Sequence, residues 1–132
     1  MVAVEQPQGV LQVLIVEDAP TEQKLMATLL TGAGYAVATT ASAEEAQAWL
    51  AHHPPPDVVV LDIMLPGDNG LSLCRHLRAH PDYQHLPIIF CSSKTSQADR
   101  FWALKQGGND YLTKPYSPRT LLAVVAKYAT HV

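Results

Sequence analysis

Short apolar segments alternate along the chain with longer segments in which apolar residues recur every three or four positions. The short segments are rich in β-branched residues, which favour strands. These strand candidates are residues 11–16, 35–39, 58–61, 87–91 and 110–112. The helix candidates are residues 20–32, 43–53, 71–80, 97–106 and 118–128. Because a helix separates each pair of neighbouring strands, the pattern predicts βαβ crossovers and a parallel sheet of the α/β class.

Proline and glycine residues lie where this pattern needs boundaries. Pro20 suits the first turn of a helix, and Gly107 suits a helix end. The three prolines at 54–56 predict an extended approach to the third strand. Asn69-Gly70 could form a hairpin turn, but a helical pattern follows it, so we interpret it as a helix start.

Two helices carry predictions about burial. The helix at 20–32 places Leu25, Leu29 and Leu30 on one stripe with Met26 beside them, as expected of a helix that covers a sheet. In the helix at 97–106 we expect Phe101 to pack on the sheet and Trp102 to be half exposed.

A chain of 132 residues suits one domain with one core. Residues 1–9 have no periodicity, so we expect a flexible tail there and a single folded domain over residues 10–132, with no further domain and no secretory signal. The longest apolar run, residues 57–65, is interrupted by Asp62 and is too short to span a membrane. We therefore expect no membrane insertion.

The charge and the two cysteines indicate which partners and which cellular compartment to expect. The formal net charge is −3 and no run of Lys or Arg occurs, so direct binding to nucleic acid is not expected. Cys74 and Cys91 lie in apolar surroundings, which indicates buried, reduced thiols and a cytoplasmic location.

Acidic residues follow two of the predicted strands. Glu17 and Asp18 come after the first strand, and Asp62 comes after the third. If the sheet has the flavodoxin-like order 2-1-3-4-5, the first and third strands are neighbours at the switch point of a doubly wound sheet, where ligands bind. The three carboxylates would then converge and require a cation, for which Mg²⁺ or Mn²⁺ is suited by its preference for oxygen ligands.

Each acid also has a simpler interpretation. Asp18 could cap the helix that starts near Pro20, and Glu17 could be a solvated strand end. Asp62 is harder to explain in this way, because apolar residues surround it and a buried carboxylate is unfavourable without a partner.

Ser92 and Lys114 follow the fourth and fifth strands, which adds a hydroxyl and an ammonium to the same edge. Together these groups could bind a phosphoryl group with a metal ion.

Four stretches resemble response-regulator receiver domains of the CheY-like family. They are residues 14–18 (Leu-Ile-Val-Glu-Asp), 57–67, 87–94 and 108–116. The resemblance extends from about residue 11 to residue 128. It implies the flavodoxin-like order assumed above, with five parallel strands and helices on both faces of the sheet.

The resemblance also implies a role for each site residue. Asp62 would be the phosphoacceptor, Asp18 would bind the metal directly, and Glu17 would bind it mostly through water. The backbone carbonyl of Met64 would be a further metal ligand. Ser92 would bond a phosphoryl oxygen.

Further implied roles concern the lysine, the switch and the output surface. Lys114 would pair with the phosphate and precede a cis peptide bond to Pro115, and Ser92 would move toward the phosphate while Tyr111 turns inward. The implied output surface comprises Arg100, Leu104, Tyr111 and Thr113.

By this resemblance, the protein is a single-domain response regulator of a two-component phosphorelay. Asp62 would accept a phosphoryl group from a sensor histidine kinase of the CheA-like kind, and the altered surface would bind a downstream protein target. The protein would not be an enzyme beyond its own phosphorylation and dephosphorylation. Residues 20–22, 91–94 and 99–108 are most similar to regulators of type IV pilus motility, chemotaxis and phototaxis of the PilH/PixH kind.

Three other classes of protein share part of this pattern. A degenerate receiver usually lacks one of the acids or the lysine, all of which are present. A haloacid-dehalogenase-like phosphatase needs a second Asp two residues after the nucleophile, where this chain has Met64. A flavodoxin needs a phosphate loop rich in Ser, Thr and Gly, where Glu17 and Asp18 would repel a phosphate. Three positions depart from the family pattern. Ala19 cannot cap a helix with its side chain, Gly108 stands where Ala is common, and Met64 would offer a metal only its backbone carbonyl.

Overall fold

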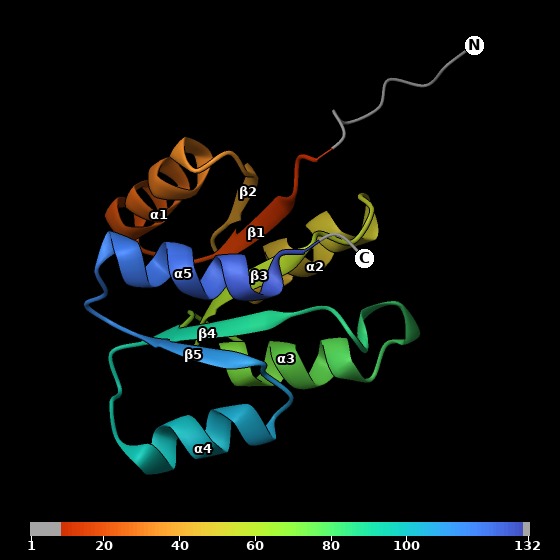
Figure 1. Cartoon of the computed structure of the whole chain (residues 1–132). Helices are drawn as coiled ribbons and strands as arrows, with labels where there is room; N and C mark the ends of the chain where they lie inside the picture. Colours follow the sequence, from red (N-terminus) through yellow and green to blue (C-terminus); the bar gives the residue numbers. More distant parts are fainter. Residues whose placement is uncertain (1–8, 131–132) are drawn as a thin grey trace.

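The computed structural model describes residues 9–130, and it consists of a five-stranded parallel sheet with helices on both faces (Figure 1). The strands are β1 (Gln12–Val16), β2 (Ala36–Thr40), β3 (Val58–Asp62), β4 (Ile88–Ser92) and β5 (Asp110–Thr113). The helices are α1 (Pro20–Gly32), α2 (Ala43–Ala51), α3 (Gly70–Arg78), α4 (Gln97–Lys105) and α5 (Pro118–Tyr128), with a short 3₁₀ turn at Pro81–Tyr83. The strand order is β2-β1-β3-β4-β5, as the resemblance implied. The sequence did not predict the 3₁₀ turn.

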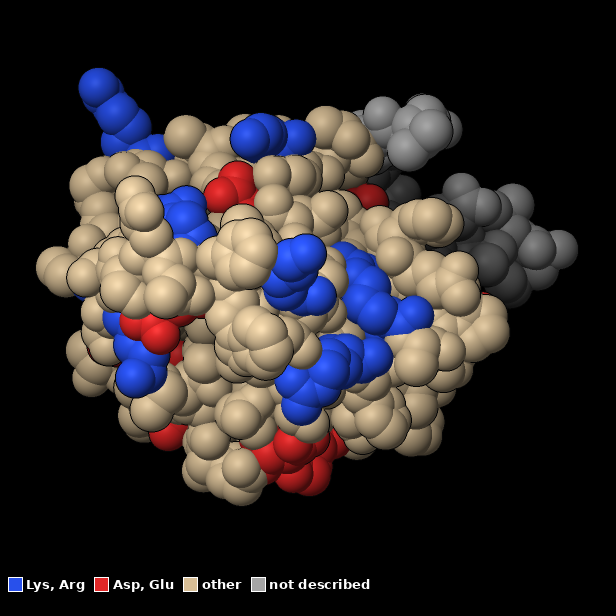
Figure 2. All heavy atoms as spheres, turned by 90° about the horizontal axis from the view of Figure 1, so that it is seen from below, with Lys and Arg blue, Asp and Glu red and all other residues tan. Residues whose placement is uncertain are grey.

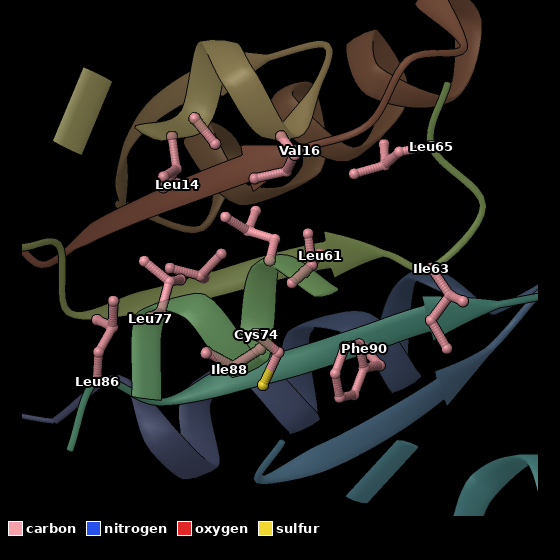
Figure 3. Packing of buried hydrophobic residues seen from close by; sticks show 14 of the residues in the cluster. Leu14, Val16, Leu61, Ile63, Leu65, Cys74, Leu77, Leu86, Ile88 and Phe90 are labelled. Carbon is pink, nitrogen blue, oxygen red and sulfur yellow. The ribbon is translucent and has the colours of Figure 1, made fainter. Parts of the chain in front are cut away.

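Two apolar clusters, one on each face of the sheet, form the core. Val13 and Ile15 of β1 pack with residues of α1 and α5, whereas Leu14 and Val16 pack with residues of α2, α3 and α4. This alternation follows from the two-residue period of a strand. The central strands β3 and β4 are buried at every position, as expected for parallel strands covered on both sides. Figure 3 shows the cluster that contains Leu14 and Val16, in which side chains of β1, β3, β4 and α3 meet.

Side-chain caps begin four of the five helices. In α2 to α5 the residue before the helix accepts a hydrogen bond from a backbone N–H of the first turn, which satisfies one otherwise unpaired donor. These residues are Ser42, Asn69, Ser96 and Ser117. The helix start predicted at Asn69-Gly70 is therefore confirmed. As expected, Ala19 gives α1 no side-chain cap, and Pro20 occupies the first turn.

Two burial predictions were wrong. Phe101 is 61% exposed, because α4 turns Ala103 toward the sheet and leaves Phe101 on the opposite side of the helix. Leu25 is 53% exposed, because α1 buries Met26 and Leu30, four residues apart on one face. Trp102 is 59% exposed, in agreement with the expectation.

The glycine at 108 has a steric explanation. A Cβ atom at this position would lie 2.3 Å from Cε2 of Phe90, a ring that is fully buried in the core. Gly108 therefore leaves the space that the large Phe90 side chain fills, and the departure from Ala is a matter of packing.

The two cysteines of the chain are buried in the core. Cys74 and Cys91 are both free and buried, as expected, and they lie on opposite faces of the sheet. Burial raises the pKa of the Cys91 thiol to about 12, so this thiol is protonated at neutral pH.

No helix within residues 9–130 combines the length and the apolar character that crossing a bilayer requires. Of the tail expected at residues 1–9, all but Gly9 lies outside the described residues.

Candidate functional site

The site lies at the carboxyl edge of the sheet, where four strands end. Asp62 is the last residue of β3 and Ser92 is the last residue of β4. Glu17 and Asp18 directly follow β1, and Lys114 directly follows β5. Because β1 pairs with β3 and β4 pairs with both β3 and β5, parallel pairing brings these strand ends together.

The three acids predicted from the sequence form one cluster. Carboxylate oxygens of Glu17, Asp18 and Asp62 lie within 4.8 Å of one another. Glu17 is 2% exposed and Asp62 is 5% exposed, whereas Asp18 faces solvent. The cluster thus has two desolvated carboxylates and one that is accessible.

Two donors hold the Asp62 carboxylate. The backbone N–H of Met64 donates to Oδ1 at 3.0 Å, and Nζ of Lys114 donates to Oδ2 at 3.3 Å. The Met64 side chain itself is 58% exposed and points away from the core. The chain after β3 therefore supplies a backbone donor to Asp62 and leaves the methionine side chain at the surface.

Lys114 contacts three carboxylates. Its Nζ lies 2.7 Å from Oε1 of Glu17 and 2.7 Å from Oε2 of Glu22, in addition to the longer contact with Asp62. Glu22 belongs to the first turn of α1 and was not among the predicted site residues. The sequence carried one signal for it, an acid two residues after Pro20 in a helix that begins at this edge, but an acid in that position is usually explained by the helix dipole.

Gln23 is a second supporting residue that sequence reasoning missed. Its Nε2 donates to the backbone carbonyls of Glu17 at 2.9 Å and Thr40 at 3.0 Å. Glu17 is further held by the N–H of Ala19, which donates to Oε2 at 3.2 Å. These bonds attach the start of α1 to the ends of β1 and β2 and orient the buried acid.

The charges of the site are strongly perturbed. Burial raises the pKa of Glu17 to about 7, although the hydrogen bond from Lys114 opposes this change. Burial alone would lower the pKa of Lys114, but its hydrogen bonds to Glu17 and Glu22 outweigh that effect and raise the pKa. The hydrogen bond from Lys114 lowers the pKa of Glu22. Lys114 is therefore charged, and one ammonium faces an excess of carboxylates.

This donor set fits a small divalent cation. Asp18, Asp62 and Glu17 offer hard oxygen ligands within one cluster, and such ligands with retained water suit Mg²⁺ or Mn²⁺. Two of these carboxylates, Glu17 and Asp62, are buried, and burial disfavours the charged form of a carboxylate unless positive charge lies close to it. A bound divalent ion would supply it.

The two predicted switch residues, Ser92 at the end of β4 and Tyr111 in β5, are linked through the loop after β4. Ser92 is 1% exposed, and its Oγ accepts a hydrogen bond from the N–H of Lys94 at 3.1 Å. Tyr111 lies inward and donates through its hydroxyl to the carbonyl of Lys94 at 2.8 Å. The guanidinium of Arg100 lies over the Tyr111 ring, 5.3 Å from its centroid. The peptide bond between Lys114 and Pro115 is cis, as the resemblance implied.

Comparison with known protein families agrees with this geometry. The response regulator receiver domain family matches residues 13–126. This chain therefore belongs to the response-regulator receiver family, and it is a receiver domain of the two-component signalling class. The matched range includes all four strand ends that build the site.

Two curated relatives differ in length. The chain is 39% identical over 114 residues to the transcriptional regulatory protein BaeR of Escherichia coli, covering 86% of this chain but only 46% of that protein. It is 36% identical over 114 residues to protein PilH of Pseudomonas aeruginosa, covering 86% of this chain and 93% of that protein. The chain thus spans about half of the first relative and nearly all of the second.

Solved structures show the same fold. A putative response regulator from Chloroflexus aurantiacus superposes with a TM-score of 0.87 at 34% identity, covering 92% of this chain and 99% of that one. The receiver domain of a sensor histidine kinase from Pseudomonas aeruginosa superposes with a TM-score of 0.83 at 30% identity, covering 92% and 98% of the two chains. That structure has a magnesium ion coordinated in its active site cleft.

Proposed function

We propose that this receiver domain is a phosphorylation-controlled switch in which Asp62 accepts a phosphoryl group. The observation that carries the proposal is the Asp62 carboxylate, which is buried at the end of β3, lies 3.3 Å from the Lys114 ammonium and clusters with Glu17 and Asp18. The donor would be a phosphohistidine of a sensor histidine kinase or a small acyl phosphate. A CheA-like kinase is the expected type.

The chemistry is a displacement at phosphorus. A carboxylate oxygen of Asp62 forms the new P–O bond while the P–N bond to the histidine, or the P–O bond to the acyl group, breaks. Lys114 places its ammonium beside the transferring group and offsets the charge on the phosphoryl oxygens. Asp18, Asp62, the Met64 carbonyl and, through water, Glu17 would hold a Mg²⁺ or Mn²⁺ ion, which supplies further positive charge there. Ser92 is expected to bond a phosphoryl oxygen.

Acetyl phosphate provides a direct test. With Mg²⁺ present, the purified protein should gain one phosphoryl group, measured by intact mass, and chelation of the metal should prevent the gain. A protein that stays unmodified under conditions that label a known receiver domain would contradict the proposal.

The output of the switch is proposed to be the surface around α4 and β5, where Arg100, Leu104 and Thr113 are at least partly exposed. Tyr111 is 5% exposed and lies under the guanidinium of Arg100. The loop between Ser92 and α4 is bonded to Tyr111 through Lys94, so a change at Ser92 can alter this surface. Adjacent aromatic residues, Phe101 and Trp102, are exposed on α4, and exposed apolar groups of this kind favour a protein contact. Figure 2 shows Lys and Arg side chains gathered near the middle of the face on the α4 side.

We expect Leu104→Arg to retain labelling by acetyl phosphate but to lose the binding of a downstream target. Leu104 is half-buried on α4 and is not one of the clustered acids, so the added charge should change the surface and leave the phosphoryl site intact. Tyr111→Ala should act in the same direction by removing the hydroxyl bond to Lys94. The measurement is target binding by the phosphorylated proteins, with Glu45→Arg on the exposed side of α2 as the control. Full binding by both variants would place the output surface elsewhere.

The pathway is inferred from similarity. The 36% identity to PilH over nearly the whole of that protein supports the PilH/PixH kind of regulator, acting in pilus motility, chemotaxis or phototaxis. The formal net charge of −3 gives this domain no electrostatic basis for binding nucleic acid directly, and the proposed location is the cytoplasm.

The lifetime of the phosphorylated state should depend on two exposed side chains. Met64 lies two residues after Asp62 and Lys94 lies two residues after Ser92, and both are exposed. Methionine orients a water molecule poorly, and a charged lysine cannot act as a base. We expect the double variant Met64→Asn, Lys94→Glu to lose labelled phosphate several-fold faster than the wild type, with similar Mg²⁺ affinity. Decay at the wild-type rate or slower would show that these side chains do not control hydrolysis.

A further inference from the structure

Lys114 uses all three of its N–H donors before any phosphoryl group arrives. The contacts with Glu17 and Glu22 are each 2.7 Å, and the contact with Asp62 is 3.3 Å. An ammonium has three donors and no acceptor. The shortest bonds of Lys114 are therefore made to acids other than the proposed phosphoacceptor.

Glu22 approaches Lys114 from the solvent side of the site. Its side chain is 49% exposed, whereas those of Asp62 and Glu17 are 6% and 3% exposed. It comes from the first turn of α1 and lines a hollow with Leu25, Ser93, Lys114, Pro115 and Tyr116. Lys114 is thus held between a buried pair of acids and one acid at the rim.

We propose that Glu22 is a positioning residue that holds Lys114 toward the rim and thereby limits how tightly the site binds a phosphoryl anion. The inference rests on the phosphoacceptor function proposed above and adds a determinant of its strength. A phosphoryl group needs donors from Lys114 and brings negative charge to the edge of the sheet. Glu22 competes for the same ammonium and repels the anion, while its charge favours a cation bound by the neighbouring acids.

This account predicts effects of opposite sign on the two ligands. Glu22→Gln keeps the shape of the side chain and removes its charge, so it should tighten the binding of an anion and weaken that of Mg²⁺. Because Glu22 is half exposed, solvent screens the effect, and changes of about threefold in each dissociation constant are expected. A loss of packing or folding would weaken both ligands together.

The experiment uses beryllofluoride as the phosphoryl probe. Its binding to the whole chain at saturating Mg²⁺ is followed by ¹⁹F NMR, and Mg²⁺ alone is titrated separately by calorimetry. Glu22→Asp keeps the charge but shortens the reach, so its values should lie between those of the wild type and Glu22→Gln. Glu45→Gln is the same chemical change at an exposed position of α2, and its dissociation constants for both ligands should match those of the wild type.

The outcomes separate this inference from the proposed function. Tighter beryllofluoride binding together with weaker Mg²⁺ binding in Glu22→Gln supports the positioning role. If the wild type binds beryllofluoride and Glu22→Gln binds it equally well or less tightly, the positioning role is wrong and the phosphoacceptor function stands. If the wild type binds no beryllofluoride with Mg²⁺ present, the phosphoacceptor function is wrong and this inference falls with it.

Discussion

Asp62→Asn is expected to reduce labelling by acetyl phosphate to the background level. The amide group of Asn is a poor nucleophile and carries no charge, so it can neither form the acyl phosphate bond nor act as an anionic ligand for a metal ion. The Asn side chain has nearly the same size and can still accept a hydrogen bond from the N–H of Met64. The substitution should therefore leave the packing around this position largely unchanged. The measurement is intact mass after incubation with acetyl phosphate and Mg²⁺.

Asp68→Asn is the matched control for this experiment. Asp68 lies in the loop between β3 and α3, outside the cluster of acids, and is partly exposed. It should be labelled like the wild type. If Asp62→Asn gains a phosphoryl group as readily as the control, another residue is the acceptor and the assignment of Asp62 is wrong.

Gly70→Ala is expected to be the most destabilising small substitution near the site. A Cβ atom at Gly70 would lie 2.2 Å from the backbone oxygen of Asp62 and 3.0 Å from the Cα of Ile63. These are backbone atoms of a buried strand end, so they cannot move away cheaply, as the end of a flexible side chain could. The clash should lower the free energy of unfolding by about 3 kcal/mol, which corresponds to a fall of roughly 10 °C in melting temperature for a domain of this size.

The same substitution should also impair phosphorylation. Gly70 begins α3, and its N–H donates to the carbonyl of Ile63 at 3.0 Å. A shift of α3 away from β3 would therefore displace the segment that positions Asp62 and Met64. We expect a several-fold slower gain of phosphoryl group at a temperature where the variant is still folded.

Gly32→Ala is the control for the change from glycine to alanine. Gly32 ends α1, and a Cβ atom there would contact nothing within 4 Å. Thermal unfolding of Gly32→Ala should therefore differ from the wild type by no more than about 0.5 kcal/mol. An equal melting temperature for Gly70→Ala and Gly32→Ala would show that α3 can move without loss, and that the close approach to Asp62 is not required.

The sequence by itself determined the order of the elements and the main acids of the site. Strand and helix periods are properties of neighbouring residues, so they can be read locally, and every predicted element was found with boundaries within two residues. Asp62 was also identifiable, because a carboxylate in an apolar segment is unfavourable without a partner wherever the segment folds. The strand order 2-1-3-4-5, by contrast, had to be taken from the resemblance to a family.

Tertiary structure decided the features that depend on distance through space. Glu22 joined the site because α1 brings it within 2.7 Å of Lys114, 92 residues away along the chain. Gly108 is explained only by the Phe90 ring against it. The exposure of Phe101 and Leu25 depends on which side of each helix faces the sheet. A stripe of apolar residues does not fix the rotation of a helix about its axis to better than one residue. Local periodicity specifies the elements, but their rotation and long-range pairings are set by packing, which involves residues that are distant in the sequence.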